Sequence, residues 1–254
     1  MQHIHMAEVS EDFAKCWQAA GIHLDKKFDG GIHSWMKSNL APPFLEHLSF
    51  RLGNQLFFIR IEDVDEQLKT PGSIEGLKKI AKVCKGHACV MPMQRIKNNW
   101  RITEMGWGLL DAKSRKLINP TELITEEKIA MTDWELQDFS VQVVREHIKK
   151  EGHELMSWQS SPEVDPSIWF VGDDGPEWVV VRPYRNLEEE PQLPENLESI
   201  IANCARISSK GNFAPVFVVC MASMMDGGQI YRGYPLIPEF GGLNPLENRL
   251  RPQL

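Results

Sequence analysis

The densest group of potential metal ligands in the sequence is Cys84, His87 and Cys89, three soft donors within six residues. A structural zinc site normally takes its ligands from two separated pairs, which this group does not provide. Cys84 and Cys89 also fit the apolar faces of the helix and the strand that their neighbours predict. The spacing therefore favours two core cysteines over a set of zinc ligands.

Carboxylates gather in the acidic turn of Asp63, Asp65 and Glu66, directly after a predicted strand. Such a turn can hold Mg²⁺ through oxygen ligands, although a solvated loop explains the same composition and is the preferred reading. No G-x-G-x-x-G, Walker loop, G-x-S-x-G or H-E-x-x-H sequence is present. The motifs therefore predict no cofactor.

The most strongly patterned stretch runs from Asp165 to Arg185. Two apolar runs, Ile168–Val171 and Trp178–Val181, flank a turn sequence rich in Gly and Asp, which is typical of a β-hairpin. The second run has four consecutive apolar residues and no alternation. This pattern indicates a central strand that is covered on both faces.

Arg182 ends the second run of the hairpin, and Arg60 ends a similar apolar run earlier in the chain. A guanidinium in this position can reach the rim of the sheet while its stem stays packed, and it can bind a carboxylate or a phosphate bidentately. Two readings remain open for both arginines, a structural ion pair and an anion-binding site. For Arg182 the candidate ion-pair partners are Asp165, Asp173 and Glu177.

Apolar periodicity and capping residues, with Ser10, Ser73 and either Thr132 or Asp133 as predicted N-caps, predict the elements that position these side chains. The predicted helices cover residues 8–20, 73–84, 132–151 and 195–208, with Gly21, Gly86, Gly152 and Gly211 as their expected ends. The predicted strands cover residues 45–51, 56–61, 88–93, 168–171, 178–181 and 215–221. Residues 95–120 are typical of strands or an irregular β-arm. Trp100, Trp107 and Trp158 are candidates for an interaction surface, although the core is the more common place for such residues.

The two halves of the chain show the same order of elements, which indicates a possible duplication. Residues 57–60 match residues 179–182 at an offset of 122, and residues 80–83 match residues 204–207 at an offset of 124. The offset drifts to about 129 at the final strands. The alternative is that unrelated strands and helices of any α/β protein share similar short apolar sequences.

These patterns divide the chain into four segments. They are an α/β unit at 1–94, a β-rich connector at 95–131, a second α/β unit at 132–225 and a Gly/Pro-rich tail at 226–254. We expect the tail to be irregular, because its Gly and Pro residues interrupt regular structure.

Length and composition are those of a globular protein of 254 residues, 42% hydrophobic and 25% charged. No apolar run approaches the roughly 18 residues that a membrane span needs, and the first ten residues lack the apolar segment of a secretory signal. The odd number of cysteines, five, argues against a disulfide framework. We therefore expect a soluble protein of the cytoplasm without membrane contact.

The net charge of −7 argues against a large surface that coats nucleic-acid phosphates. A local basic patch is still compatible with this charge. The richest basic clusters are Lys78, Lys79, Lys82 and Lys85, and the pair Lys149 and Lys150. At helical spacing a solvated helix face is the preferred reading of both clusters.

The α-β-β-β-α-β order of residues 132–221, with Asp165 near the start of one strand and a hairpin leading to a buried strand, resembles the PD-(D/E)XK nuclease-like superfamily. Residues 8–93 fit it more loosely. In active members an Asp and a following Glu/Gln-x-Lys hold a divalent metal and position a water for phosphodiester hydrolysis. The resemblance implies that Asp165 takes the place of this Asp.

The remaining motif positions depart from the superfamily. The acidic position falls on Val180 and the Lys position on Arg182, while Phe58 and Arg60 hold these places in the first half. A shifted register that uses Glu177 as the acid would put Val179 at the Lys position. The resemblance therefore implies a fold in which the usual metal-binding carboxylate is missing.

We expect an α/β (α+β) fold with a mixed central sheet flanked by helices, and a degenerate or anion-binding site formed by Asp165, Glu177, Arg182 and Arg60. The leading hypothesis is a non-catalytic binding or assembly protein, without a cofactor, that contacts a protein or a nucleic acid. The alternative is an atypical nuclease for DNA or RNA that uses Mg²⁺, with Asp165, Glu177 and Glu154 or Glu163 as its carboxylates. A third reading, a subunit of a larger bacterial assembly, differs little from the first.

Overall fold

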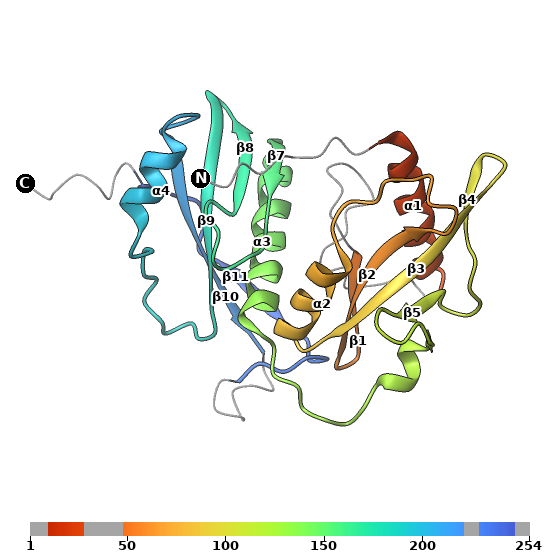
Figure 1. Ribbon diagram of the computed structural model, residues 1–254. Coiled ribbons are helices and arrows are strands. Elements are labelled where there is room, and N and C mark those ends of the chain that lie inside the picture. Colours follow the sequence, from red (N-terminus) through yellow and green to blue (C-terminus); the bar gives the residue numbers. More distant parts are fainter. Residues whose placement is uncertain (1–9, 28–47, 221–228, 247–254) are drawn as a thin grey trace, which may run out of the picture. The chain divides into compact units, whose positions relative to one another are not determined.

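The chain folds into two units, Met1–Glu127 and Lys128–Leu254, each built around its own six-stranded mixed sheet (Figure 1). This computed structural model describes residues 10–27, 48–220 and 229–246. The architecture is the predicted α+β class. Among the described helices, none combines the length and the apolar character that crossing a membrane requires.

The first unit contains a sheet in the order β1-β2-β3-β5-β6, with β4 also paired to β3. Strands β2 and β3 are parallel, and helix α2 makes the crossover between them, whereas β1 and β2 form an antiparallel hairpin. The elements are α1 (Glu11–Asp25), β1 (Leu48–Leu52), β2 (Gln55–Asp63), α2 (Ile74–Val83), β3 (His87–Ile96), β4 (Asn99–Ile102), β5 (Leu109–Asp111), β6 (Leu117–Ile118) and a 3₁₀ turn (Pro120–Leu123).

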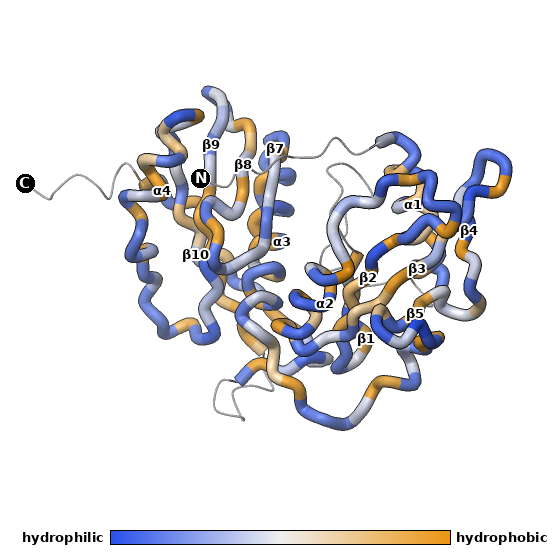
Figure 2. The backbone as a smooth tube through the Cα atoms, in the orientation of Figure 1, coloured by the Kyte–Doolittle hydropathy of each residue, from blue (hydrophilic) through white to orange (hydrophobic). Residues whose placement is uncertain are grey.

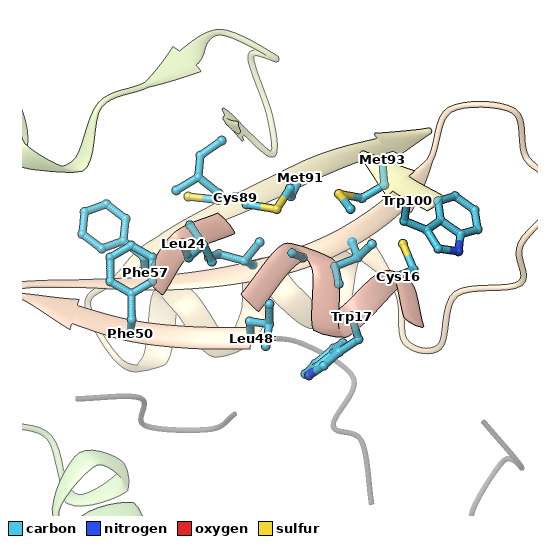
Figure 3. Close-up of a cluster of buried hydrophobic side chains, with 14 of the residues drawn as sticks. Cys16, Trp17, Leu24, Leu48, Phe50, Phe57, Cys89, Met91, Met93 and Trp100 are labelled. Atoms are coloured by element: carbon cyan, nitrogen blue, oxygen red, sulfur yellow. The ribbon is translucent and has the colours of Figure 1, made fainter. Parts of the chain in front are cut away.

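Helix α1 covers one face of this sheet with a continuous apolar stripe. The predicted cap Ser10 is confirmed, because its hydroxyl accepts a hydrogen bond from the backbone N–H of Phe13. The side chains of the stripe, Trp17 and Leu24 among them, belong to one buried cluster with strand residues such as Phe57 (Figure 3). Helix α2 packs on β2 and β3 and is capped by Ser73, as predicted.

The second unit contains a sheet in the order β11-β10-β9-β8-β7, with β12 also paired to β10. Strands β7, β8 and β9 form an antiparallel meander, and β10 runs parallel to β9 after the crossover helix α4. The elements are α3 (Asp133–Lys150), β7 (Glu154–Trp158), β8 (Ile168–Gly172), β9 (Gly175–Tyr184), α4 (Leu197–Cys204), β10 (Gly211–Val219), β11 (Ile237–Phe240) and β12 (Asn244–Pro245).

Strand β9 is covered on both faces, as its unbroken apolar run predicts. Val179 and Val181 belong to the core beneath α3, whereas Trp178 and Val180 belong to the core beneath α4. Because successive side chains of a strand point to opposite faces, a doubly covered strand must be apolar at every position. Helices α3 and α4 therefore lie on opposite faces of this sheet.

The two units share the arrangement of a hairpin, a crossover helix and a parallel strand. In the first unit Phe57 pairs with His87, and in the second unit Val179 pairs with Asn212. With the hairpin strands aligned at the predicted offset of 122, these pairings give an offset of 125 on the final strands and not the predicted value of about 129. Residues 28–47, where the first unit would need a further strand to match the second, lie outside the described residues.

Several expected boundaries need correction. Helix α1 continues through Gly21 to Asp25, because this glycine is buried in the helix and is not a left-handed terminator. Helix α4 ends at Cys204, and Gly211 is the first residue of β10. A neighbouring side chain, described below, explains why glycine stands at the start of β10.

The connector and the tail also hold more regular structure than expected. Residues of the segment 95–131 form β4, β5 and β6 of the first sheet, so this segment belongs to the first unit down to Glu127. The tail 226–254 contributes β11 and β12, which pair with β10. Pro238 is tolerated in β11 because this strand lies at the edge of the sheet, where the missing backbone N–H is not needed for pairing.

Candidate functional site

The side chains of Asp165 and Arg182 form a bidentate ion pair on the α4 face of the second sheet. Arg182 donates from Nη1 to Oδ1 over 3.0 Å and from Nη2 to Oδ2 over 2.5 Å. Asp165 lies in the loop before β8, and its side chain is only 7% exposed, whereas that of Arg182 is 23% exposed. Both carboxylate oxygens of Asp165 are therefore engaged by one guanidinium.

Arg182 makes a further hydrogen bond to the backbone, and Cys204 of helix α4 lies near Asp165. Nη1 of Arg182 also donates to the carbonyl oxygen of Val181 over 2.9 Å. Burial raises the pKa of the Cys204 thiol on α4 to about 11, and the negative charge of Asp165 adds to this shift. Cys204 is therefore a protonated packing residue beside the ion pair and not a nucleophile.

Glu177 lies on the other face of the same strand. It is five residues from Arg182, an odd separation that places the two side chains on opposite sides of the sheet. Its carboxylate accepts a hydrogen bond of 3.0 Å from the side-chain amide of Asn212 on β10. The predicted group of Asp165, Arg182 and Glu177 is therefore divided, and only the first two residues come together.

Val180 occupies the position at which the nuclease resemblance requires the acid. Its side chain is fully buried in the core between β9, β10 and α4. This position lies on the same face as Arg182, two residues along the strand. Asp165 and Arg182 are therefore in contact, and the residue that the resemblance would assign to the acidic position is a buried valine.

Arg60 makes the corresponding contacts in the first unit, but with a loop and not with a single carboxylate. Its Nη2 donates to the Thr70 hydroxyl over 2.7 Å and to the backbone carbonyls of Thr70 and Gly72. Its Nη1 lies 3.5 Å from a carboxylate oxygen of Glu62. Arg60 thus holds the loop between β2 and α2, and it lies in a different unit from Arg182.

The acidic turn after β2 is organised by Asp63. This carboxylate accepts hydrogen bonds from the backbone N–H groups of Asp65, Gln67 and Leu68, at 3.1, 2.9 and 2.8 Å. Its oxygens therefore satisfy the backbone of a turn, which is the structural alternative to a Mg²⁺ site.

Cys84, His87 and Cys89, the candidate zinc ligands, have structural roles in the packing of the first unit. Both cysteines are fully buried, and the imidazole of His87 stacks on Phe57 and bonds to the side chain of Gln55. Within the residues that the structure describes, no group of three or more His, Cys, Asp or Glu side chains is arranged to hold a metal ion.

The three candidate surface tryptophans pack against other side chains. Trp100 belongs to the core of the first unit, and Trp107 stacks on Phe50 at a centroid distance of 6.1 Å. Trp158 lies under the guanidinium of Arg145, 3.8 Å from its ring centroid. These contacts favour the packing role over an interaction surface.

Sequence reasoning did not find the most deeply buried ion pair of the second unit, between Glu135 and Arg232. The sequence does point to Glu135, because Thr132-x-x-Glu135 is a capping-box pattern at the start of α3. The partner lies 97 residues later, in a segment whose composition predicted only irregular structure.

Comparisons with known proteins give one match. A family model described as a domain of unknown function (DUF8840) matches residues 134–246, from α3 to the end of β12. No curated protein and no solved structure matches the chain. The matched residues lie within the second unit, which holds the Asp165–Arg182 pair.

Proposed function

We propose that this chain is a non-catalytic binding or assembly protein whose second unit keeps a nuclease-like layout as a scaffold. The observation that carries the proposal is the Asp165–Arg182 pair, in which both oxygens of the motif Asp accept hydrogen bonds from a guanidinium. A catalytic Asp must present an oxygen to a divalent metal. Here each oxygen of Asp165 already accepts a hydrogen bond from Arg182, and the positive charge of this guanidinium would oppose the binding of a divalent cation.

The buried Val180 supports the same conclusion. A divalent metal in a phosphodiesterase is held by two or more carboxylates that converge on it. The second carboxylate position carries an isopropyl group in the α4 core, and Glu177 lies on the opposite face. The alternative, a nuclease with Mg²⁺ and an atypical set of carboxylates, would need Asp165 released from Arg182.

The test compares hydrolysis and stability in one variant, Asp165→Asn. We expect the wild-type protein to leave supercoiled plasmid and single-stranded RNA intact with Mg²⁺ or Mn²⁺, and Asp165→Asn to lower the melting temperature. A scaffold residue should be needed for stability. A catalytic carboxylate is often held at a cost in stability, so its removal should abolish cutting and leave stability equal or higher.

Asp173→Asn in the exposed hairpin turn is the matched control, because it makes the same chemical change away from the ion pair. It should change neither measurement. Metal-dependent nicking that is present in the wild type and in Asp173→Asn but lost in Asp165→Asn would refute the proposal.

A further inference from the structure

Helix α2 of the first unit carries a cluster of positive charge on its outer side. Its inner side buries Leu77 and Ala81 against the sheet, whereas Lys78, Lys79 and Lys82 are exposed. We call these three residues the lysine face. Figure 2 shows the hydrophilic and hydrophobic residues alternating along this helix.

The three lysines make no direct ion pair within the part of the chain that the structure describes. No ion pair joins Lys78, Lys79 or Lys82 to a carboxylate there, although Glu75 stands three and four residues before two of them. Lys78 and Lys82 are four residues apart, and like charges at this spacing repel each other and destabilise a helix. The helix therefore holds a repulsion that an external anion would relieve.

Two of the acidic residues that precede α2 in the chain, Glu62 and Asp63, make contacts outside the lysine face. Glu62 accepts from Arg115 and lies beside Arg60, and Asp63 accepts hydrogen bonds from three backbone N–H groups.

The charge of the chain is also unevenly divided between the two units. The first unit has 17 Lys and Arg against 16 Asp and Glu, a net charge of +1, and the second unit has 11 against 19, a net charge of −8.

We propose that the lysine face binds the phosphate backbone of a nucleic acid without reading its sequence. Lysine is a flexible point charge that suits phosphate, and contacts to phosphate alone give affinity without sequence preference. The cores of protein interfaces are instead enriched in aromatic residues and Arg and depleted in Lys. No aromatic residue or Arg lies on α2, so nucleic acid is favoured over an acidic protein.

The net negative charge of the whole chain does not prevent such binding. Exposed charges more than about 8 Å apart are largely screened at physiological salt, so a nearby phosphate senses mainly the lysine face. The inference rests on the proposed function and deepens it, because it names nucleic acid as the ligand of a protein that is proposed to bind without cutting.

The test is fluorescence anisotropy of the full chain with a labelled 20-base-pair duplex over a series of salt concentrations. If each lysine of the face neutralises one phosphate, log K falls against log salt with a slope of about −2.7, from −0.9 per contact. Affinity should then drop about 40-fold between 50 and 200 mM salt. The double variant Lys78→Gln with Lys82→Gln should reduce the slope by about 1.8.

The matched control is Lys149→Gln with Lys150→Gln at the exposed end of α3, which removes the same charge from the second unit. It should leave affinity and slope unchanged. The inference is wrong if the duplex does not bind at 50 mM salt, or if both double variants weaken binding equally. It is also wrong if polyglutamate competes as well as unlabelled duplex, since an acidic protein would then be the better partner.

This test fails separately from that of the proposed function. Loss of duplex binding leaves the absence of cutting intact, whereas metal-dependent cutting that requires Asp165 would refute the proposed function even if the lysine face binds the duplex.

Discussion

Arg232 donates two hydrogen bonds of 2.8 Å to the carboxylate of Glu135, from Nε to Oε1 and from Nη2 to Oε2. Both side chains are fully buried. The backbone N–H and the hydroxyl of Thr132 also donate to Oε2, over 3.0 and 3.1 Å. One carboxylate thus caps the start of α3 and binds a segment 97 residues further along the chain.

Removing one partner of this pair should destabilise the second unit strongly. We expect Arg232→Met to lower the free energy of unfolding by about 3–5 kcal/mol, because it leaves the charge of Glu135 buried and unpaired. Changing both partners to Met should cost less than Arg232→Met alone, since no buried charge then remains. Chemical denaturation of the two single variants and the double variant measures both effects.

The exposed pair of Arg185 and Asp133 is the control. Arg185→Met should cost less than about 1 kcal/mol, because surface ion pairs contribute little. If Arg232→Met were as mild as Arg185→Met, the segment after β10 would not be anchored through this guanidinium.

The Glu135–Arg232 pair illustrates what sequence can and cannot predict. The capping box is local, and Thr132-x-x-Glu135 predicts the start of α3 to the residue. The choice of Arg232 as partner depends on a chain reversal after β10, which no local spacing encodes. The same limit applies to the tail, where β11 and β12 exist because β10 offers them unpaired backbone groups.

The ion pair of Arg182 and Asp165 should be a structural bridge. We expect Arg182→Met to lower the free energy of unfolding by about 2 kcal/mol, less than for a fully buried pair because Arg182 is partly exposed. Methionine keeps the apolar stem, so the loss reports the charge. Urea denaturation followed by tryptophan fluorescence measures it.

Lys210→Met serves as the control for Arg182→Met, because Lys210 pairs with the exposed Asp174 at the surface of the same unit. It should be close to neutral. Equal stability of Arg182→Met and the wild type would show that the bridge is dispensable. An anion-binding role for Arg182 would then be the better account of its position.

The sequence predicted the strand that carries Arg182 better than it predicted the site. Four consecutive apolar residues identify β9 as doubly covered, because only burial on both faces removes the alternation. The separation of Glu177 from Arg182 also follows from the parity of positions on one strand. The pairing of Arg182 with Asp165 was one of three sequence-compatible choices, since a loop before β8 decides where Asp165 lies.

The cysteines should be unreactive in the folded protein. All five are buried, and burial raises the pKa of Cys16 to about 12, with the charge of Asp63 as a second cause. Thiolate is the reactive form, so we expect no titration by an aromatic disulfide reagent at pH 8 without denaturant and five thiols per chain with it.

The raised pKa of Cys16 also has a consequence for stability. The unfolded thiol loses its proton near pH 9.0 and the folded thiol only near pH 12, so the unfolded chain is favoured as pH rises above 9. Unfolding free energy should therefore fall above pH 9, and less so in Cys16→Ala. Rapid modification of a thiol at pH 8 under native conditions would contradict the burial of these side chains.

Gly86 directly precedes β3, and Gly211 is the first residue of β10, so the two glycines stand in similar places at the start of the parallel strand that follows each crossover helix. A Cβ at Gly211 would lie 2.2–2.6 Å from ring atoms of the buried Trp178, and a Cβ at Gly86 would lie 2.8 Å from the carbonyl oxygen of Leu56. Leu56 and Trp178 correspond at the predicted offset of 122. Close approach to the same strand position thus requires glycine in both units.

Alanine at either glycine should therefore destabilise the protein by about 1–3 kcal/mol through overpacking. The Trp178 ring cannot yield readily, since its Nε1 donates to the carbonyl of Ser208 over 3.1 Å. Gly76→Ala in α2 is the control, because its Cβ would meet only the Ser73 hydroxyl, at 3.2 Å, and alanine favours a helix by about 1 kcal/mol over glycine. Thermal melts of the three variants measure these differences in stability. If Gly86→Ala is as harmless as Gly76→Ala while Gly211→Ala is not, the two glycines do not serve the same purpose and the internal duplication loses its packing argument.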